Sequence, residues 1–227
     1  MLYKNTVSQE ILTITKELQN NLLFTDFHLA GGTSLALQIG HRTSTDIDLF
    51  TYKNVNFYDL GRFFKKNPNK YKIDIEQDGF LRVFVDGIKV ELIHDDVGKL
   101  ISEPKKIDDI RYLDKYEIAP MKIKAITGRT KSRDFIDVAY LLQEISLNDI
   151  FSLYKEKYGA VNINILKREM LSKSKMIKND EWLIGIEMIK NDINIKDIPN
   201  IIKQSIEEYN NINGIGKHTN NKKTVII

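Results

Sequence analysis

The segment from Leu29 to Phe50 constrains the fold more than any other part of this chain. Its apolar start is broken at Gly31-Gly32, a short stretch with helical spacing runs to Ile39, and Asp46-Ile47-Asp48 follows. This order predicts a strand, a glycine turn, a helix and a second strand. Because side chains alternate across a strand, the two aspartates share one face and the isoleucine between them points to the other.

Two carboxylates on one face of a strand repel each other unless a cation lies near them. Carboxylate oxygens are suitable ligands for Mg²⁺, and successive backbone N–H groups where a glycine turn enters a helix can bind phosphate. Asp46, Asp48 and Gly31-Gly32 therefore indicate phosphoryl or nucleotidyl transfer. The alternative interpretation is an exposed strand edge that follows a tight turn of purely structural use.

Residues around the glycine turn allow two interpretations each. Thr33 or Ser34 is expected to cap the helix, and the Ser34 hydroxyl is alternatively a donor to phosphate. Gly40 is expected to end the helix. Arg42 either neutralises a leaving pyrophosphate or is solvated. The turn lacks the Gly-Lys-Ser/Thr ending of a P-loop, and the aspartates lack the continuation typical of aspartyl-phosphate phosphatases, so no covalent phosphoenzyme is expected.

The strongest local signal is Asp86-Gly87, a two-residue turn between two runs of strand-forming residues. A loop of this length places Val85 opposite Ile88, and therefore Arg82 opposite Glu91. Glu91 then lies on the polar face, where it is a candidate third ligand for a metal held by the two aspartates. The alternative is a cross-strand ion pair between Glu91 and Arg82.

Secondary-structure patterns divide the chain into two parts. The N-terminal part mixes expected helices and strands, whereas helical patterns dominate after His94 and strand signals are nearly absent. We predict an α+β protein, with an N-terminal α/β lobe containing a small mixed sheet over 1–112 and a helical lobe over 113–227. The polar end from about 214 is expected to be mobile. The expected helices cover 7–20, 33–39, 57–66, 116–127, 132–145, 147–158, 163–174 and 198–210; the expected strands cover 27–30, 46–52, 71–76, 80–85 and 88–93.

Lys122 interrupts an apolar helical stripe, whereas its neighbour Lys124 is expected to look outward. In the next expected helix, Asp134 lies in the apolar arc and Asp137 lies at its edge. A buried charge needs a partner, so an interhelical ion pair between Lys122 and one of these aspartates is one interpretation. In the other, Lys122 binds triphosphate oxygens, and Asp134 or Asp137 orients it or accepts a proton.

The composition excludes several classes of site. The chain has no cysteine, so a disulfide, a thiolate metal site and a cysteine nucleophile are excluded. Its 34 basic and 31 acidic residues nearly balance, so net charge alone does not indicate nucleic-acid binding. No apolar run is long enough to span a bilayer and the start of the chain does not resemble a signal peptide, so we expect a cytoplasmic protein without a membrane partner.

The run Ala30-Gly31-Gly32 followed by Asp46-Ile47-Asp48 resembles the hallmark of the polymerase-β-like nucleotidyltransferase superfamily, and Val90-Glu91-Leu92 is similar to its third acidic position. Within that superfamily, four blocks between about residues 27 and 145 are similar to the AbiEii/AbiGii toxin family. These blocks are Leu29–Leu37, Gly40–Phe50, Met121–Ile126 and Arg133–Asp137. The chain departs from the pattern at Glu91, where a shorter Asp is frequent.

The resemblance implies the toxin of a bacterial toxin–antitoxin or abortive-infection system, with a separately encoded antitoxin as its partner. Such an enzyme transfers NMP from an NTP to an acceptor hydroxyl with Mg²⁺ as cofactor, and some relatives act on the 3′ end of tRNA. The expected catalytic residues are Asp46, Asp48, Lys122 and Asp137; the expected metal ligands are Asp46, Asp48 and Glu91; the expected nucleotide-binding or phosphate-binding residues are Gly31, Gly32, Thr33, Ser34, Arg42, Lys122 and Asp134.

Two other functions are compatible with the same residues. In the first, the enzyme transfers the nucleotide to a small molecule or a protein instead of RNA. In the second, the chain is a catalytically silent member of the fold that binds a nucleotide or a partner. The positions of Glu91 and Lys122 discriminate between these possibilities, because a site lacking either one beside the aspartates favours the silent protein.

Overall fold

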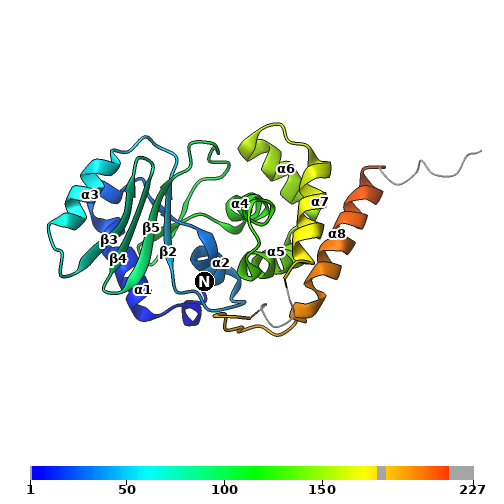
Figure 1. The fold of residues 1–227 in the computed structure, drawn as a ribbon, viewed down its shortest axis with the longest axis horizontal. Helices are drawn as coiled ribbons and strands as arrows, with labels where there is room; N and C mark the ends of the chain where they lie inside the picture. The colour runs from blue at the N-terminus through cyan, green and yellow to red at the C-terminus, as the bar shows by residue number, and fades with distance from the viewer. Residues whose placement is uncertain (1, 178–182, 215–227) are drawn as a thin grey trace, which may run out of the picture.

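The computed structural model describes residues 2–177 and 183–214. It confirms the α+β class, with a seven-stranded mixed sheet on one side and a group of helices on the other (Figure 1). The segment expected to be mobile lies outside the described residues from 215 onward. Within the described part of the chain, no helix is both long enough and apolar enough to cross a bilayer.

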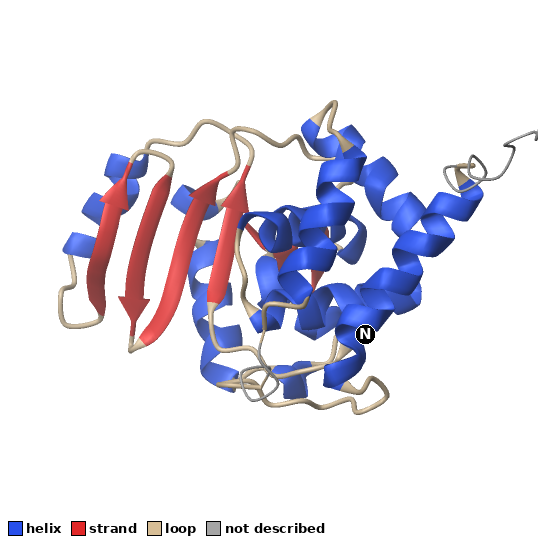
Figure 2. Ribbon diagram, turned by 45° about the vertical axis from the view of Figure 1, so that its right-hand side comes forward, coloured by secondary structure: helices blue, strands red, loops and turns tan. Residues whose placement is uncertain are grey.

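The sheet has the strand order β3-β4-β5-β2-β1-β7-β6. Figure 2 shows strands of this sheet standing side by side next to the helices. The parallel pairing of β2 with β5 lies at the centre of the order and places Asp48 beside Glu91. The strands are β1 (His28–Leu29), β2 (Ile47–Thr51), β3 (Tyr71–Gln77), β4 (Phe80–Val85), β5 (Ile88–His94), β6 (Lys105–Ile107) and β7 (Ile110–Tyr112).

The hairpin of β4 and β5 has the predicted register. Val85 pairs with Ile88 and Arg82 pairs with Glu91. Asp86 and Gly87 have φ values of 50° and 84°, as a turn with two left-handed residues requires. Alternate residues of β4 and β5, including Val83 and Val90, are fully buried, so the polar face of the hairpin carries Glu91.

The expectation that strands would be nearly absent after His94 was wrong, because β6 and β7 follow it. Strands β6 and β7 have only three residues each, too few for a period-two pattern to be recognised. Their turn contains Asp108 and Asp109, with φ values of 50° and 66°. The pairing that adds them to the sheet joins Leu29 of β1 to Tyr112 of β7, a long-range contact that no local pattern indicates.

The helices follow the predicted segments closely. The 3₁₀ turns Lys4–Thr6, Leu22–Phe24 and Ile195–Asp197 are short additions. The α-helices are α1 (Gln9–Asn20), α2 (Gly31–Ile39), α3 (Phe57–Lys65), α4 (Lys115–Gly128), α5 (Ser132–Glu144), α6 (Leu147–Tyr158), α7 (Ile163–Ser174) and α8 (Ile198–Ile212).

Helix α2 begins at Gly31, two residues before Thr33 and three before Ser34, the two expected caps. Its N-cap is Ala30, which makes no side-chain hydrogen bond, so the prediction that Thr33 or Ser34 caps the helix was wrong. Both hydroxyls are buried because they bond to other segments. Thr33 bonds to the Asp46 carbonyl and Ser34 donates to the Leu113 carbonyl at 2.9 Å. These bonds hold α2 against the segments that carry the candidate site.

The buried apolar residues form two clusters. One joins the sheet to α1 and α3, and the other packs α4 to α8 together. Helix α2 contributes to both, because Leu37 belongs to the sheet cluster and Leu35 and Ile39 belong to the helical cluster. The clusters follow the two expected lobes in outline, while the boundary between 112 and 113 stays a prediction.

Candidate active site

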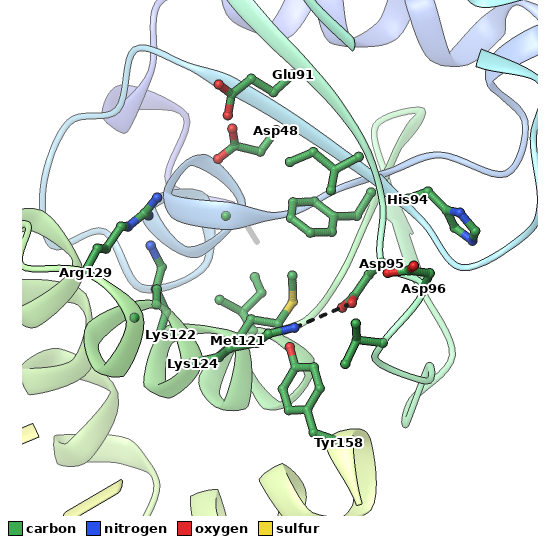
Figure 3. Close-up of a pocket in the computed structure, with 17 residues that line it drawn as sticks. Asp48, Glu91, His94, Asp95, Asp96, Met121, Lys122, Lys124, Arg129 and Tyr158 are labelled. Atoms are coloured by element: carbon green, nitrogen blue, oxygen red, sulfur yellow. Dashed lines mark ion pairs between the residues drawn. The ribbon is translucent and has the colours of Figure 1, made fainter. Parts of the chain in front are cut away.

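A cavity of about 540 Å³ opens between the sheet and helix α4. Gly31 lines it at the start of α2, and Asp48 and Glu91 line it from β2 and β5. Lys122 from α4 and Arg129 just after α4 reach toward these carboxylates from the opposite side (Figure 3). A volume of this size and a mixed polar and apolar lining are typical of a small-molecule site.

Asp48 and Glu91 are register neighbours on parallel strands, so their side chains project from the same face of the sheet. Burial, followed by the charge of Glu91, raises the pKa of Asp48 to about 6. Two adjacent carboxylates, one of them buried, are a high-energy arrangement unless a cation or proton is shared. The pair is therefore the strongest electrostatic indication of function in the cavity.

Gly31 is required beside this acidic pair. Its φ is +63°, and a Cβ at this position would overlap Oδ2 of Asp48. The backbone at the start of α2 therefore approaches the Asp48 carboxylate more closely than any other residue would allow. The glycine turn expected from the sequence thus lies directly at the acidic pair.

The Asp46 carboxylate does not join Asp48 and Glu91, because it contacts basic side chains instead. Asp46 precedes β2, and its carboxylate accepts from Lys89 Nζ at 2.9 Å and from Arg133 Nη1 at 3.3 Å. Among residues 2–177 and 183–214, no group of three or more carboxylate or histidine side chains is arranged to hold a metal. The expected convergence of Asp46, Asp48 and Glu91 is therefore not met, because lysine and arginine side chains neutralise Asp46.

Glu91 also has cationic neighbours. Arg82 Nε donates to Glu91 Oε1 at 2.8 Å, which is the cross-strand ion pair predicted from the hairpin register. Lys89 Nζ lies 3.7 Å from the same oxygen. The side chain of Glu91 nevertheless lines the cavity. The ion pair and a role in the site are thus compatible.

Lys122 makes the interhelical ion pairs that its apolar stripe predicted. Its Nζ lies 2.8 Å from Asp134 Oδ1 and 2.7 Å from Asp137 Oδ2, and both aspartates come from α5. Burial opposes the ammonium charge, but the two aspartates outweigh burial and raise the pKa of Lys122. Lys122 also lines the cavity, so its ion pairs leave it within the candidate site, and its binding of a triphosphate stays a prediction.

Asp137 is the centre of this buried charge cluster. Arg42 holds it with a two-point contact, Nε to Oδ1 at 2.7 Å and Nη2 to Oδ2 at 2.9 Å. His41 Nε2 lies 2.7 Å from Oδ1. Burial favours the neutral acid, yet Arg42 and Lys122 hold the pKa of Asp137 well below its ordinary value. Such a carboxylate is a poor proton acceptor, so its geometry supports positioning of Lys122 and Arg42.

The remaining expected phosphate ligands are occupied by protein contacts. A Cβ at Gly32 would overlap Nη2 of Arg42, so this glycine makes room for the guanidinium. Arg42 is buried rather than solvated, and its third contact is with the Thr43 carbonyl at 2.9 Å. Thr33 and Ser34 are buried and bonded to backbone carbonyls. These residues support the segments that carry the site, but they do not line the cavity.

Several cavity residues were not predicted from the sequence. Arg129 pairs with Asp134 through Nε at 2.8 Å. Lys124 is exposed, as expected, and its side chain also lines the cavity, 4.4 Å above the ring of Tyr158. Basic residues at alternate positions, Arg129, Lys131 and Arg133, near the junction of two expected helices could have indicated a role for Arg129. No local signal pointed to Tyr158, which comes from another helix.

Residues 14–204 match the family model described as nucleotidyl transferase AbiEii toxin, type IV toxin–antitoxin system. An uncharacterized protein of Aquifex aeolicus (strain VF5) is 31% identical over 153 residues, which cover 64% of this chain and 73% of that protein.

Two solved structures show weaker similarity. A crystal structure of ANT(2″)-Ia in complex with adenylyl-2″-tobramycin has 12% identity and a TM-score of 0.46, covering 65% of this chain and 95% of that chain. The MenT4 nucleotidyltransferase toxin of Mycobacterium tuberculosis H37Rv has 14% identity and a TM-score of 0.39, covering 75% of this chain and 65% of that chain.

Proposed function

Because the chain belongs to the AbiEii nucleotidyltransferase toxin family of type IV toxin–antitoxin systems, we propose that its cavity transfers NMP from an NTP to an acceptor hydroxyl. In this reaction the hydroxyl oxygen forms a bond to the α-phosphorus, and the bond from that phosphorus to the β-phosphate oxygen breaks. Pyrophosphate leaves, and the hydroxyl proton passes to a carboxylate of the acidic pair or to water.

The single observation that carries the proposal is the arrangement across the cavity. Asp48 and Glu91 lie on one wall, and Lys122 and Arg129 reach in from the other (Figure 3). Phosphoryl transfer spreads negative charge over the phosphate oxygens, and fixed cations stabilise that charge in a site with little water. A catalytically silent protein has no need to keep both Glu91 and Lys122 at one cavity.

The acidic pair fits a divalent cation of the Mg²⁺ class. Both side chains offer carboxylate oxygens, and burial together with the charge of Glu91 raises the pKa of Asp48, so a bound divalent cation would relieve the repulsion between the two acids. We assign Asp48 and Glu91 as the primary ligands and Asp46 as a third that requires release from Lys89 and Arg133. Bound Mg²⁺ would supply charge neutralisation at the α-phosphate and the leaving group.

The residues of the chain have separate tasks in this proposal. Lys122 and Arg129 bind triphosphate oxygens as charged hydrogen-bond donors. Asp134 and Asp137 hold these cations in place, because each contacts at least two of the basic side chains. Gly31 brings the backbone at the start of α2 close to Asp48 and lines the cavity beside it. Catalysis thus depends on positioning more than on covalent chemistry.

The acceptor we propose is RNA, with the 3′ end of tRNA as the specific candidate. The basic residues Arg129, Lys131 and Arg133 occupy alternate positions from the end of α4 to the first turn of α5, and Arg133 reaches Asp46. Such side chains contact a phosphate backbone well. We further propose that the protein acts in the bacterial cytoplasm during abortive infection and is neutralised there by its antitoxin.

A labelling experiment tests this function. Purified protein is incubated with each α-³²P-labelled NTP, Mg²⁺, and either total RNA, total protein or a small-molecule fraction. We expect label in RNA of tRNA size, with pyrophosphate released in equal amount and no label when Mg²⁺ is chelated. Asp48→Asn is the inactive control. Label in protein or in the small-molecule fraction contradicts the RNA acceptor, and absence of label in all fractions contradicts the transferase.

A further inference from the structure

The far end of the cavity is built by three side chains other than the acidic pair, Lys122 and Arg129. Asp95 follows β5, Lys124 comes from α4, and Tyr158 ends α6 (Figure 3). Lys124 Nζ lies 4.4 Å from the centre of the Tyr158 ring and 3.9 Å from Asp95 Oδ1. Nothing in the transfer step described above uses these three side chains.

The wall that carries Asp95 is fixed in place by a buried ion pair. Glu117 of α4 and Lys157 of α6 pair with each other, and neither side chain is exposed. Glu117 Oε2 accepts from the backbone N–H of Ile101 at 3.0 Å and of Ser102 at 3.1 Å, and Lys157 Nζ donates to the Lys99 carbonyl at 3.0 Å. The loop after β5 is therefore anchored to both helices before any ligand arrives.

Asp95 itself is held within this wall. Its backbone N–H donates to the Thr51 carbonyl at 3.0 Å, and its Oδ1 accepts from the Gly98 N–H at 3.0 Å. The residue is nearly buried, yet it lines the cavity. An ordered carboxylate of this kind presents a hydrogen-bond acceptor in a defined direction.

The chemistry of this end matches a flat, polar-edged ring. Tyr158 offers an aromatic face, and Phe50, Ile93 and Met121 give the adjoining cavity apolar lining. Asp95 can only accept and Lys124 can only donate hydrogen bonds. Every nucleobase has stacking faces and a polar edge with a donor beside an acceptor, and aromatic side chains stack on such faces.

We propose that this far end is the nucleobase subsite, in which Lys124 and Asp95 read the edge of the base and Tyr158 contacts its face. The inference rests on the proposed function, because it places the triphosphate of the same NTP at Lys122 and Arg129. The cavity is continuous between the two ends and its volume of about 540 Å³ suits one nucleotide. Lys124 and Asp95 are thus specificity-determining residues.

Equilibrium binding to the full chain tests the subsite. The Kd values of ATP, GTP, CTP, UTP and pyrophosphate are measured by calorimetry with Mg²⁺ for wild type, Lys124→Met and Asp95→Asn. The methionine keeps an apolar stem over Tyr158, and the asparagine oxygen can still accept from Gly98. Lys155→Met is the matched control, because Lys155 lies exposed on α6 and does not line the cavity.

We expect wild type to bind one NTP at least about tenfold more tightly than the weakest, as paired hydrogen bonds to a base edge allow. Each cavity variant should reduce that ratio to about threefold or less, with the Kd of pyrophosphate and the behaviour of Lys155→Met unchanged. Equal weakening of all four NTPs, unchanged ratios, or a wild type without base preference overturns the subsite. A wild type that binds neither NTP nor pyrophosphate overturns the proposed function instead.

Discussion

Among substitutions in the buried charge cluster that preserve the volume of the side chain, Asp137→Asn should destabilise this protein most. The substitution keeps the volume of the side chain and removes only its charge. Arg42 makes both of its side-chain ion-pair contacts to Asp137, and its side chain is 5% exposed. The variant therefore leaves a buried guanidinium without a carboxylate partner.

The magnitude follows from the charges in the cluster. Wild type places Arg42, Lys122 and Arg129 against Asp134 and Asp137, and the variant places the same three cations against Asp134 alone. Removing one partner of a buried ion pair costs about 3–5 kcal/mol. For a chain of this length, each kcal/mol lowers Tm by about 2–4 °C, so the expected loss is about 6–20 °C.

Lys122→Met is the informative comparison. It leaves Arg42 paired with Asp137 and Arg129 paired with Asp134, so the two remaining cations are matched by two aspartates. We expect a loss of about 1–3 kcal/mol, the scale of losing charged hydrogen bonds without stranding a charge. Nucleotide affinity should fall by about 10–1000-fold in this variant, because Lys122 lines the cavity.

Urea unfolding followed by circular dichroism at pH 7.5, without nucleotide, measures both losses. The double variant Arg42→Met, Asp137→Asn should recover part of the stability lost in Asp137→Asn, because the stranded charge is gone. A loss below about 1 kcal/mol in Asp137→Asn, or a smaller loss than in Lys122→Met, would falsify the view that Asp137 is the anchor of the cluster.

The pH dependence of this loss has a defined sign. The neighbouring cations lower the folded-state pKa of Asp137, so its contribution to stability is present above the unfolded carboxyl pKa of about 3.9. The contribution is lost only as pH falls through the lower folded pKa. The difference in unfolding free energy between wild type and Asp137→Asn should therefore stay constant from about pH 5 to pH 8.

Three further variants probe the acidic pair. Without divalent cations, Asp48→Asn should raise the free energy of unfolding by about 1–2 kcal/mol at pH 7.5 and abolish transfer activity. Because the pKa of Asp48 in the folded protein is raised to about 6, this gain in stability should fade as pH drops through 6 toward 4. An equal gain at pH 4 in urea unfolding contradicts this reasoning. Lys89→Met should tighten Mg²⁺ binding by about fivefold in calorimetry, because Lys89 competes at Asp46 and Glu91; weaker binding refutes that competition. Gly31→Ala should reduce transfer activity at least about 100-fold, because a Cβ at this position displaces Asp48. The control Gly87→Ala has φ +84° and open space around the new Cβ, so it should show only backbone strain of about 1–2 kcal/mol. Similar activity in both variants contradicts the close approach of the Gly31 backbone to Asp48.

Local patterns were sufficient for the elements of the site. The period of a strand placed Asp48 on the polar face of β2, and the Asp86-Gly87 turn set the register that brings Glu91 to the same face. The apolar stripe of α4 showed that Lys122 is buried and needs a partner. Each of these conclusions depends on how a side chain is directed relative to its own element, which the sequence contains.

What each side chain contacts across elements depended on tertiary packing. Thr33 and Ser34 do not cap helix α2, because their hydroxyls bond to the Asp46 and Leu113 carbonyls. The Asp46 carboxylate is held away from the acidic pair by Arg133, which is distant in sequence. The far end of the cavity, where Lys124 meets Tyr158, likewise exists only once α4 packs on α6.

The sequence by itself thus determined the α+β class, the glycine turn and the strand faces that carry the acids, because these follow from short-range periodicity. Only the tertiary structure decided that Asp137 anchors Arg42 and Lys122 and that Lys89 neutralises Asp46. The physical reason is that a charged side chain pairs with whichever opposite charge the packed elements bring within a few ångströms, and that choice is made by contacts between segments far apart in the chain.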